Sequence, residues 1–481
     1  MNPKDNSLTR RNFLKLLGLG SAAVAAPALT GCSAGEKSAS PDEPPVGKMT
    51  YRTCPTTGDK VSLLGYGMMR LPTVGGHGSA REKGGGEIDQ DMVNKEVDYA
   101  IEHGVNYFDT SPAYCQGLSE HATGIALSRR KREEFFIATK MSNFSEETWS
   151  REASMEMFRN SLKELQVDYI DYYLLHSIGN GGDAMAEFNS RYIDNGMLDF
   201  LKAQREAGTI RNLGFSYHGD IAVFDHALAM QDRGEIKWDF VQIELNYVDW
   251  NLADEINDRN TDAEYLYGEL HKRGIPSVVM EPLLGGRLAH LPDPLSRQLL
   301  ARDPDSSVAS WAFRYAGTRP DVLTVLSGMT RMEHLKDNLL TYCPLKPMTD
   351  QEMRFIEGIG AQLVSYHTIP CSDCKYCMPC PYGIDIPGIF IHYNKCLSEA
   401  HVPRERLSPE YYEARRAFLV GYDRSVPKLR QADHCIGCGQ CSPHCPQRID
   451  IPRELHTISD YVEALKQDKD LPADPRQEDQ E

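Results

Sequence analysis

A short cysteine-rich segment occurs twice in the second half of the chain. Each copy carries three cysteines at C-x2-C-x2-C spacing, then a fourth cysteine, a proline and an Ile-Asp-Ile-Pro tail. Cysteines this close within one run pair poorly as disulfides, and structural zinc sites separate two C-x2-C halves by a longer loop. Four soft thiolates in so small a space suit an iron–sulfur cluster. We therefore expect two 4Fe-4S clusters on Cys371, Cys374, Cys377, Cys380, Cys435, Cys438, Cys441 and Cys445.

The second run resembles the C-x2-C-x2-C-x3-C-P motif of two-cluster ferredoxins, and the first run is one residue shorter before its last cysteine. In those ferredoxins the fourth cysteine of each run binds the other cluster. The resemblance implies that Cys445 completes the cluster of the first run and that Cys380 completes the cluster of the second. Between the runs, LSPEYYEARRAFL predicts a helix, so this part is similar to the mostly helical ferredoxin domains of respiratory and reductase subunits.

The amino-terminal segment TRRNFLK (9–15) resembles a twin-arginine export signal. The apolar run that follows is too short and too rich in glycine for a membrane span of ~20 residues. LTGC (29–32) is similar to a lipobox, which implies acylation of Cys32 and a stable lipid anchor. The alternatives are a general secretory signal and an incidental cysteine. We expect a signal peptide (1–31), a flexible tether (32–47) and export by the twin-arginine translocon. The mature protein would be lipid-anchored at the outer face of the cytoplasmic membrane, or periplasmic.

The middle of the chain alternates short apolar runs with amphipathic stretches. Near-continuous apolar runs are typical of parallel strands covered on both faces, and glycine follows several of the predicted helices. Eight such units predict a (β/α)8 barrel at 48–345, with 49–52 forming a hairpin at its bottom. A linker helix (346–370), the cluster domain (371–462) and an acidic tail (463–481) follow. The expected strands are 61–65, 106–110, 135–140, 169–176, 210–216, 240–245, 276–280 and 322–326.

Polar residues stand at the ends of three neighbouring predicted strands. Asp109, Lys140 and His176 end the second, third and fourth strands, and Tyr114 follows Asp109. Chemistry in such barrels sits where the strands end. Asp109 can pair with Lys140, a cation beside Tyr114 would prepare its phenol to donate a proton, and His176 can orient a substrate oxygen. Singly, each residue has an ordinary structural reading as a turn cap, a solvated charge or core packing.

The segments NYFDTSPAY, FFIATK, YYLLH and IRNLGFS resemble the aldo-keto reductase superfamily. The resemblance implies a catalytic tetrad of Asp109, Tyr114, Lys140 and His176 that acts on a small carbonyl or alcohol. It also implies NAD(H) or NADP(H) held by Ser216, Gln242 and Asn338. The cofactor pattern is incomplete, because Tyr217 replaces an asparagine and Met280 replaces the aromatic residue that stacks on the nicotinamide.

Near the eighth strand, Thr330 and Glu333 predict a capping box for the last helix of the barrel. Its free amides could still receive a phosphate.

A net charge of −17 over 481 residues disfavours nucleic acid as a partner. The sequence favours an exported iron–sulfur oxidoreductase that exchanges electrons with a redox protein. One alternative is an electron-transfer protein that uses the barrel as a docking scaffold. Another is a cytoplasmic aldehyde reductase. Four further cysteines receive no role beyond burial: Cys54, Cys115, Cys343 and Cys396.

Overall fold

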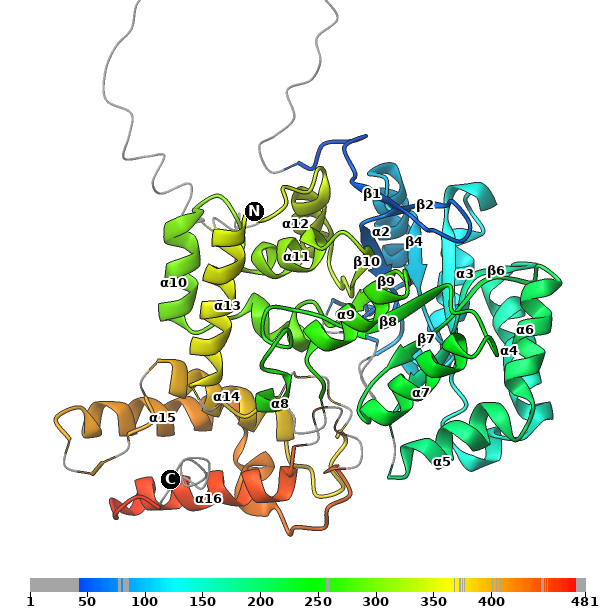
Figure 1. Cartoon of the computed structure of the whole chain (residues 1–481). Helices are drawn as coiled ribbons and strands as arrows, with labels where there is room; N and C mark the ends of the chain where they lie inside the picture. The colour runs from blue at the N-terminus through cyan, green and yellow to red at the C-terminus, as the bar shows by residue number, and fades with distance from the viewer. Residues whose placement is uncertain are drawn as a thin grey trace, which may run out of the picture. The chain divides into compact units, whose positions relative to one another are not determined.

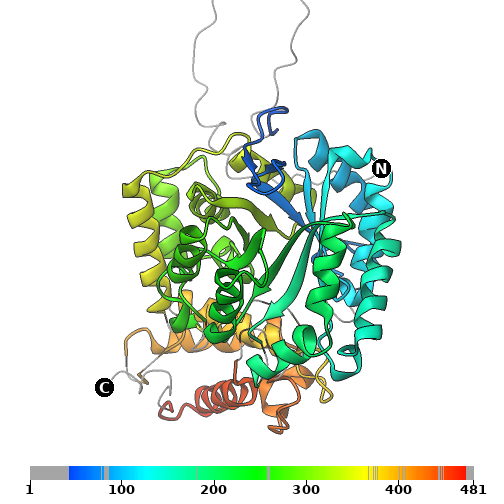
Figure 2. The ribbon, with the colours of Figure 1, turned by 45° about the vertical axis from the view of Figure 1, so that its right-hand side comes forward.

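Eight parallel strands close into a barrel that occupies the first two thirds of the chain (Figures 1 and 2). The last strand pairs in parallel with the first, Val325 opposite Leu64, and this pairing closes the ring. The predicted fold class is confirmed. The strands are β3 (Leu64–Gly67), β4 (Tyr107–Asp109), β5 (Phe136–Met141), β6 (Ile170–Ile178), β7 (Ile210–Tyr217), β8 (Phe240–Glu244), β9 (Ser277–Met280) and β10 (Val322–Ser327).

The computed structural model describes residues 43–76, 79–80, 86–180, 182–256, 260–366, 368–371, 373, 375, 377–399, 401–403, 405–406, 408–442, 445, 447 and 449–472. All of them belong to one compact unit, Asp42–Glu481. The predicted signal peptide, Cys32, most of the tether, Cys374 and the end of the acidic tail lie outside these ranges.

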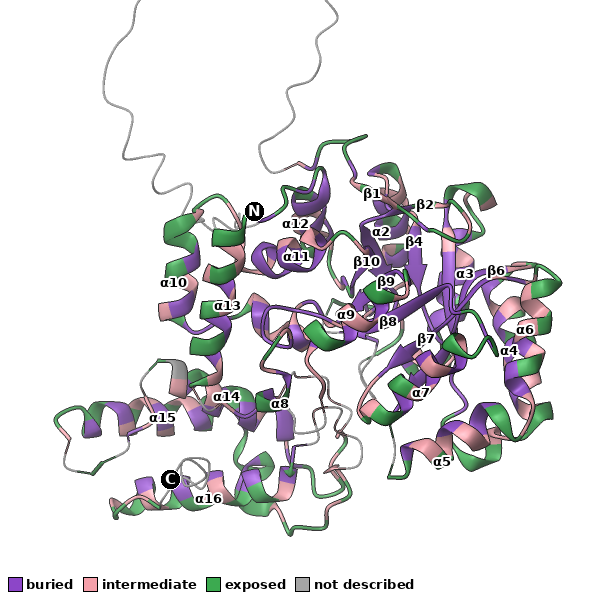
Figure 3. Ribbon diagram, in the orientation of Figure 1, coloured by how far each residue is buried: buried purple, intermediate pink, exposed green. Residues whose placement is uncertain are grey.

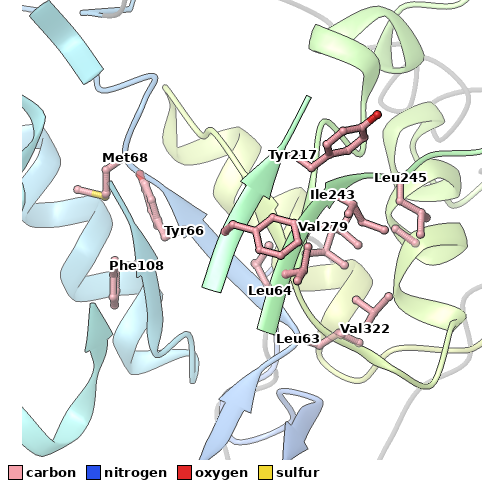
Figure 4. Packing of buried hydrophobic residues seen from close by; sticks show 14 of the residues in the cluster. Leu63, Leu64, Tyr66, Met68, Phe108, Tyr217, Ile243, Leu245, Val279 and Val322 are labelled. Carbon is pink, nitrogen blue, oxygen red and sulfur yellow. The ribbon is translucent and has the colours of Figure 1, made fainter. Parts of the chain in front are cut away.

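The barrel strands are buried on both faces, as their apolar sequences predict. All nine residues of β6 are buried, and the strands are drawn almost entirely in purple in Figure 3. Toward the helices, side chains such as Tyr66, Phe108 and Ile243 belong to one continuous apolar cluster (Figure 4). Each fully buried apolar side chain of this size contributes roughly 1.5–3 kcal/mol to stability. The barrel is therefore a rigid support for the side chains at its mouth.

Amphipathic helices cover the outside of the barrel, and short polar residues begin several of them. Asp89 Oδ1 accepts from the Met92 N–H (3.0 Å), and Ser150 Oγ accepts from the Ala153 N–H (3.2 Å). The main helices are α2 (Gln90–Glu102), α3 (Ser119–Leu127), α4 (Arg151–Leu165), α6 (Met197–Glu206), α7 (Ile221–Asp232), α9 (Ala263–Lys272), α11 (Val308–Thr318) and α12 (Met332–Tyr342). Insertions between them carry α5 (Ala184–Phe188), α8 (Ala253–Ile256) and α10 (Asp293–Arg302).

The first predicted strand, 61–65, spans two separate elements. β1 (Tyr51–Thr53) and β2 (Lys60–Ser62) form an antiparallel hairpin, and the barrel strand β3 starts only at Leu64. The Ser62 N–H donates to Asn106 Oδ1 (2.8 Å) just before β4, which places the hairpin at the amino-terminal end of the barrel. The hairpin expected there is confirmed, with its second strand taken from the residues assigned to the barrel.

The carboxy-terminal part is helical and has an apolar core of its own. Helix α13 (Asp350–Val364) starts at a capping box of Thr349 and Glu352 and precedes α14 (Ile386–Ser398), α15 (Tyr411–Ser425) and α16 (Ile451–Gln467). Helix α16 continues five residues past position 462, where the sequence placed the start of the tail. In the described part of the chain, no helix has both the length and the apolar character needed to cross a membrane.

Candidate active site and cluster sites

Four polar side chains meet at the carboxyl ends of adjacent barrel strands. Asp109 ends β4, while Lys140 and His176 lie near the ends of β5 and β6. Tyr114 begins the short 3-10 helix η1 (Tyr114–Gly117) that follows β4. Asp109, Tyr114 and His176 line one cavity of about 1760 Å³. The structure therefore brings together the four residues that the sequence singled out.

Asp109 and Lys140 form an ion pair inside the barrel. Lys140 Nζ donates to Asp109 Oδ1 (2.6 Å) and to the Thr110 carbonyl (2.8 Å), and the lysine side chain is fully buried. Burial raises the pKa of the Asp109 carboxyl and lowers the pKa of the Lys140 ammonium, each against the attraction of its partner. Since burial penalises both charges, Lys140 holds its proton less tightly than a solvated lysine does.

Tyr114 lies between the lysine and the histidine. Lys140 Nζ is 4.7 Å from the centre of the Tyr114 ring, and the edge of the His176 ring faces it at 5.8 Å between centres. The next two residues, Cys115 and Gln116, have left-handed φ values of 49° and 58°. Such conformations cost about 1–3 kcal/mol each and persist only where the surroundings enforce them. This sharp turn fixes Tyr114 at the mouth.

His176 is held through its Nδ1 atom by two serines. Ser142 Oγ lies 2.6 Å from His176 Nδ1 and 2.8 Å from Ser111 Oγ. Burial, together with the positive charges of Lys140 and Arg191, lowers the pKa of His176 well below its usual range, so the ring is neutral. With Ser142 as the donor, the proton of the ring sits on Nε2. His176 can then donate a hydrogen bond to a substrate oxygen.

The three residues expected to bind a nicotinamide cofactor differ in whether their polar side-chain atoms already have hydrogen-bond partners. Ser216 Oγ accepts from the Ser177 N–H (2.7 Å). Gln242 and Asn338 line the large cavity, and Asn338 donates to Ser327 Oγ (2.9 Å). The Gln242 Oε1 atom is buried and has no hydrogen-bond partner among the described residues. An amide donor of a ligand fits this oxygen.

The residues near the start of α12 fit the phosphate end of a dinucleotide less well than Gln242 fits the nicotinamide end. Thr330 donates its hydroxyl proton to the Arg70 carbonyl (2.9 Å), and α12 begins after Arg331 without a side-chain cap. The expected capping box is therefore wrong, because Thr330 bonds the loop after β3 instead. Glu333 and Asp337 line the cavity here together with Arg70, and two carboxyl groups at this end disfavour the binding of a phosphate. Tyr217 donates to the Gly219 carbonyl and does not line the cavity.

Cysteines from both runs share a second, smaller cavity. Its lining includes Cys371 and Cys377 of the first run and Cys445 of the second, with Ile386 and Phe390 among its apolar side chains. Cys445 therefore lies with two cysteines of the first run, as the crossed arrangement of the ferredoxin motif would require, while Cys374 lies outside the described residues. A thiolate-lined, apolar site suits an iron–sulfur cluster.

Two of the remaining cysteines lie near Cys441. Its thiol interacts electrostatically with Cys435 and with Cys380, the last cysteine of the first run. Cys438 is exposed. Among the described residues, no three His, Cys, Asp or Glu side chains converge on one point as the shell of a single metal ion. The geometry thus shows which cysteines are neighbours, and their roles as ligands stay a proposal.

The large cavity joins the two functional regions. Its lining contains Tyr114 and His176 at the barrel mouth together with Cys371 and Cys445 of the first cluster site. Lys395 of α14 also lines it. The barrel mouth thus opens onto the first cluster site within one cavity.

Three residues that line or support these sites were not predicted from the sequence. Arg70 and Arg287 line the large cavity from loops, and Ser142 bonds His176 from just beyond β5. The two arginines carry no spacing signal, since isolated loop arginines are common on any surface. The signal for Ser142 was its position two residues after Lys140, at the end of a barrel strand.

A model described as the aldo/keto reductase family matches residues 63–361, more than half of the chain. The chain belongs to the aldo/keto reductase family. A second model, the 4Fe-4S dicluster domain, matches residues 370–450, which contain both cysteine runs. The protein is therefore an oxidoreductase whose family barrel is followed by an iron–sulfur domain.

Several relatives are similar to about two thirds of this aldo/keto reductase. L-galactose dehydrogenase of Arabidopsis thaliana is 25% identical over 323 residues, covering 63% of this chain and 92% of that protein. The uncharacterized oxidoreductase YqkF of Bacillus subtilis is 25% identical over 322 residues, covering 64% and 96%. Among solved structures, the holo form of aldo-keto reductase AKR11C1 from Bacillus halodurans has 25% identity and a TM-score of 0.50, covering 65% and 96%.

Proposed function

We propose that the protein interconverts a small carbonyl compound and its alcohol outside the cytoplasm, with electrons passing through two 4Fe-4S clusters. The observation that supports this most is the single cavity lined by Tyr114 and His176 on one side and by Cys371 and Cys445 on the other. A substrate in this cavity meets the groups that handle its proton and lies beside the first cluster site. A bound cluster supplies or accepts one electron at a time.

The side chains at the barrel mouth manage the proton. In the direction of reduction, the substrate takes up two electrons and two protons. Tyr114 donates its phenol proton to the carbonyl oxygen and regains it from Lys140, and the solvent supplies the proton that the carbon receives with the two electrons. The Asp109 carboxylate holds Lys140 in place, with 2.6 Å between Oδ1 and Nζ. His176 orients the same oxygen through Nε2. The Phe144 ring packs against the His176 ring, with 4.9 Å between the two ring centres.

The decisive variant is Tyr114→Phe, which removes one hydroxyl and preserves the ring beside Lys140. The proposal requires a loss of carbonyl turnover of at least a hundredfold, the usual contribution of a positioned general acid, with the iron content unchanged. Phe144→Leu is a matched control, because it changes an aromatic ring at the same mouth without removing a proton donor. Turnover that is unaffected by Tyr114→Phe would show that the tetrad does not act.

The cysteines divide into two proposed ligand sets. Cys371, Cys374, Cys377 and Cys445 would hold the first cluster, and Cys435, Cys438, Cys441 and Cys380 the second. Two such clusters predict about eight iron and eight sulfide ions per chain. Metal and sulfide analysis of anaerobically purified protein measures both. Zinc in place of iron would contradict the assignment.

The exposed Cys438 makes the second cluster the natural exchange point with a redox protein. Tyr382 and Ile436, close in sequence to proposed ligands of that cluster, are 48% and 62% exposed, so an apolar surface is available there for transient docking. A nicotinamide nucleotide at Gln242, Ser216 and Asn338 remains a further proposal. Extraction of the folded protein and chromatography of the released small molecules tests for NAD(H) or NADP(H).

Export and lipid anchoring at Cys32 complete the proposal. They are supported by the twin-arginine and lipobox motifs of the sequence. Cell fractionation of the full chain and of a Cys32→Ser variant separates the possibilities. Membrane association that depends on Cys32 is expected. Recovery in the cytosol with residues 1–31 attached would contradict export.

A further inference from the structure

Arg287 occupies the boundary between the barrel mouth and the first cluster site. It lies in η5 (Leu284–Ala289), the turn that follows β9, where Gly285 and Gly286 adopt left-handed φ values of 68° and 105°. Its Nη2 donates to the Thr368 hydroxyl (3.0 Å), three residues before Cys371. The arginine is thereby tied directly to the segment that enters the first cysteine run.

The second terminal nitrogen of Arg287 is buried and unsatisfied. Nη1 has no hydrogen-bond partner among the described residues. A guanidinium stays protonated in proteins, and leaving one of its donors buried without an acceptor is destabilising. An unsatisfied charged donor at this position indicates that a negatively charged group belongs beside it.

The described surroundings of Arg287 offer two candidates for that group. The guanidinium interacts electrostatically with Asp249 and with Cys371. Asp249 is buried, and burial together with the charges of Glu244 and Glu281 raises its pKa well above the usual range. It therefore favours the neutral form and does not cancel the arginine's charge. Cys371, as a cluster thiolate, remains the charged neighbour.

Cys371 belongs to both cavities. It lines the large cavity together with Arg287 and Thr368, and it lines the smaller thiolate cavity with Cys377 and Cys445. A positive charge at this shared boundary favours the reduced cluster, which carries one more negative charge than the oxidised cluster.

We propose that Arg287 is a positioning residue that raises the reduction potential of the first cluster by placing its guanidinium against the Cys371 thiolate. The inference rests on the proposed function, because it takes Cys371 as a ligand of that cluster. It assigns the arginine an electrostatic role at one cluster and none at the other. It adds a determinant of the electron-transfer step that lies outside both cysteine runs.

The test is a dye-mediated redox titration of the anaerobic holoprotein, followed by electron paramagnetic resonance of the two clusters. In Arg287→Gln, one cluster should become at least tenfold harder to reduce, which is about 59 mV for a one-electron couple, and the other should not move. Arg287→Lys keeps the charge and should shift less. Arg297→Gln, an exposed arginine on α10, is the matched control and should leave both potentials unchanged.

A further variant covers the case in which Arg287→Gln loses its cluster. If Arg287→Gln loses iron, Thr368→Val frees Nη2 without removing the charge and should produce a smaller shift of the same cluster. Unchanged potentials, or equal shifts of both clusters, would overturn the inference. The potential is read without substrate, so absent carbonyl turnover in the wild-type protein would count against the proposed function alone.

Discussion

The buried pair of Asp109 and Lys140 allows stability to be separated from catalysis in a double-mutant cycle. Two unit charges 2.6 Å apart attract by about 6 kcal/mol at an effective dielectric constant near 20, against a desolvation penalty of similar size. Removing one partner strands the other charge in the barrel. Asp109→Asn and Lys140→Met should each lower the free energy of unfolding by about 3–5 kcal/mol.

The double variant should behave differently. With both charges gone, its free energy of unfolding should lie within about 2 kcal/mol of the wild type, since an apolar pair often replaces a buried ion pair without loss. Part of that difference is the hydrogen bond from Lys140 to the Thr110 carbonyl. Its turnover should nevertheless be abolished, because Tyr114 loses its proton source. A stable but inactive double variant would show that the pair serves the chemistry.

The assay is a urea titration followed by tryptophan fluorescence. All four tryptophans of the chain lie in the barrel, so the signal reports on this part alone. Asp109→Asn should be less destabilised at pH 9 than at pH 6. Its stranded lysine has a folded pKa below the unfolded value of about 10.4, so the unfolded state binds more protons between these values and stability rises with pH. Additive losses in the double variant would refute the coupling.

Three further predictions follow from the geometry. Ser142→Ala removes the hydrogen-bond partner of His176 Nδ1 and should lower kcat/KM about tenfold, the equivalent of one hydrogen bond. The stability should be nearly unchanged. Activity equal to that of the wild type would show that Ser142 does not set the tautomer of His176. Burial raises the pKa of Glu120 to about 7, so the folded state binds the extra proton between about pH 4.5 and 7. As the pH rises from about 4.5 to 7, the free energy of unfolding of the wild type should fall by about 3 kcal/mol relative to that of Glu120→Gln. Thermal unfolding at both pH values measures this difference. Cys445→Ser should abolish the same paramagnetic signal as Cys371→Ser, whereas ligation within each run would make the two variants differ.

The sequence was most informative where burial dictates residue type. Strands such as β6 are covered on both faces, so their near-continuous apolar runs mark them, and the tetrad could be read from the polar residues that end them. The first strand was misplaced because residues 61–65 are all buried. The end of the hairpin strand and the start of the barrel strand both lie within this segment, and its uniform burial hides the boundary between them. The positions of Arg287 and Arg70 at the cavity could not be predicted from the spacing of residues in the sequence. Each lies in a connecting segment, and only the three-dimensional fold brings that segment to the cavity.

Cys445 lines the same small cavity as Cys371 and Cys377, although it lies 74 and 68 positions further along the chain. If Cys445 completes the first cluster, as proposed, a nascent polypeptide that has exposed only the first run would lack a complete binding shell for iron, and assembly would wait until translation is nearly finished. Filling that shell would then link two distant segments and close the long loop between them. Maturation of the two clusters would be interdependent, and we expect a chain truncated before its second run to contain neither.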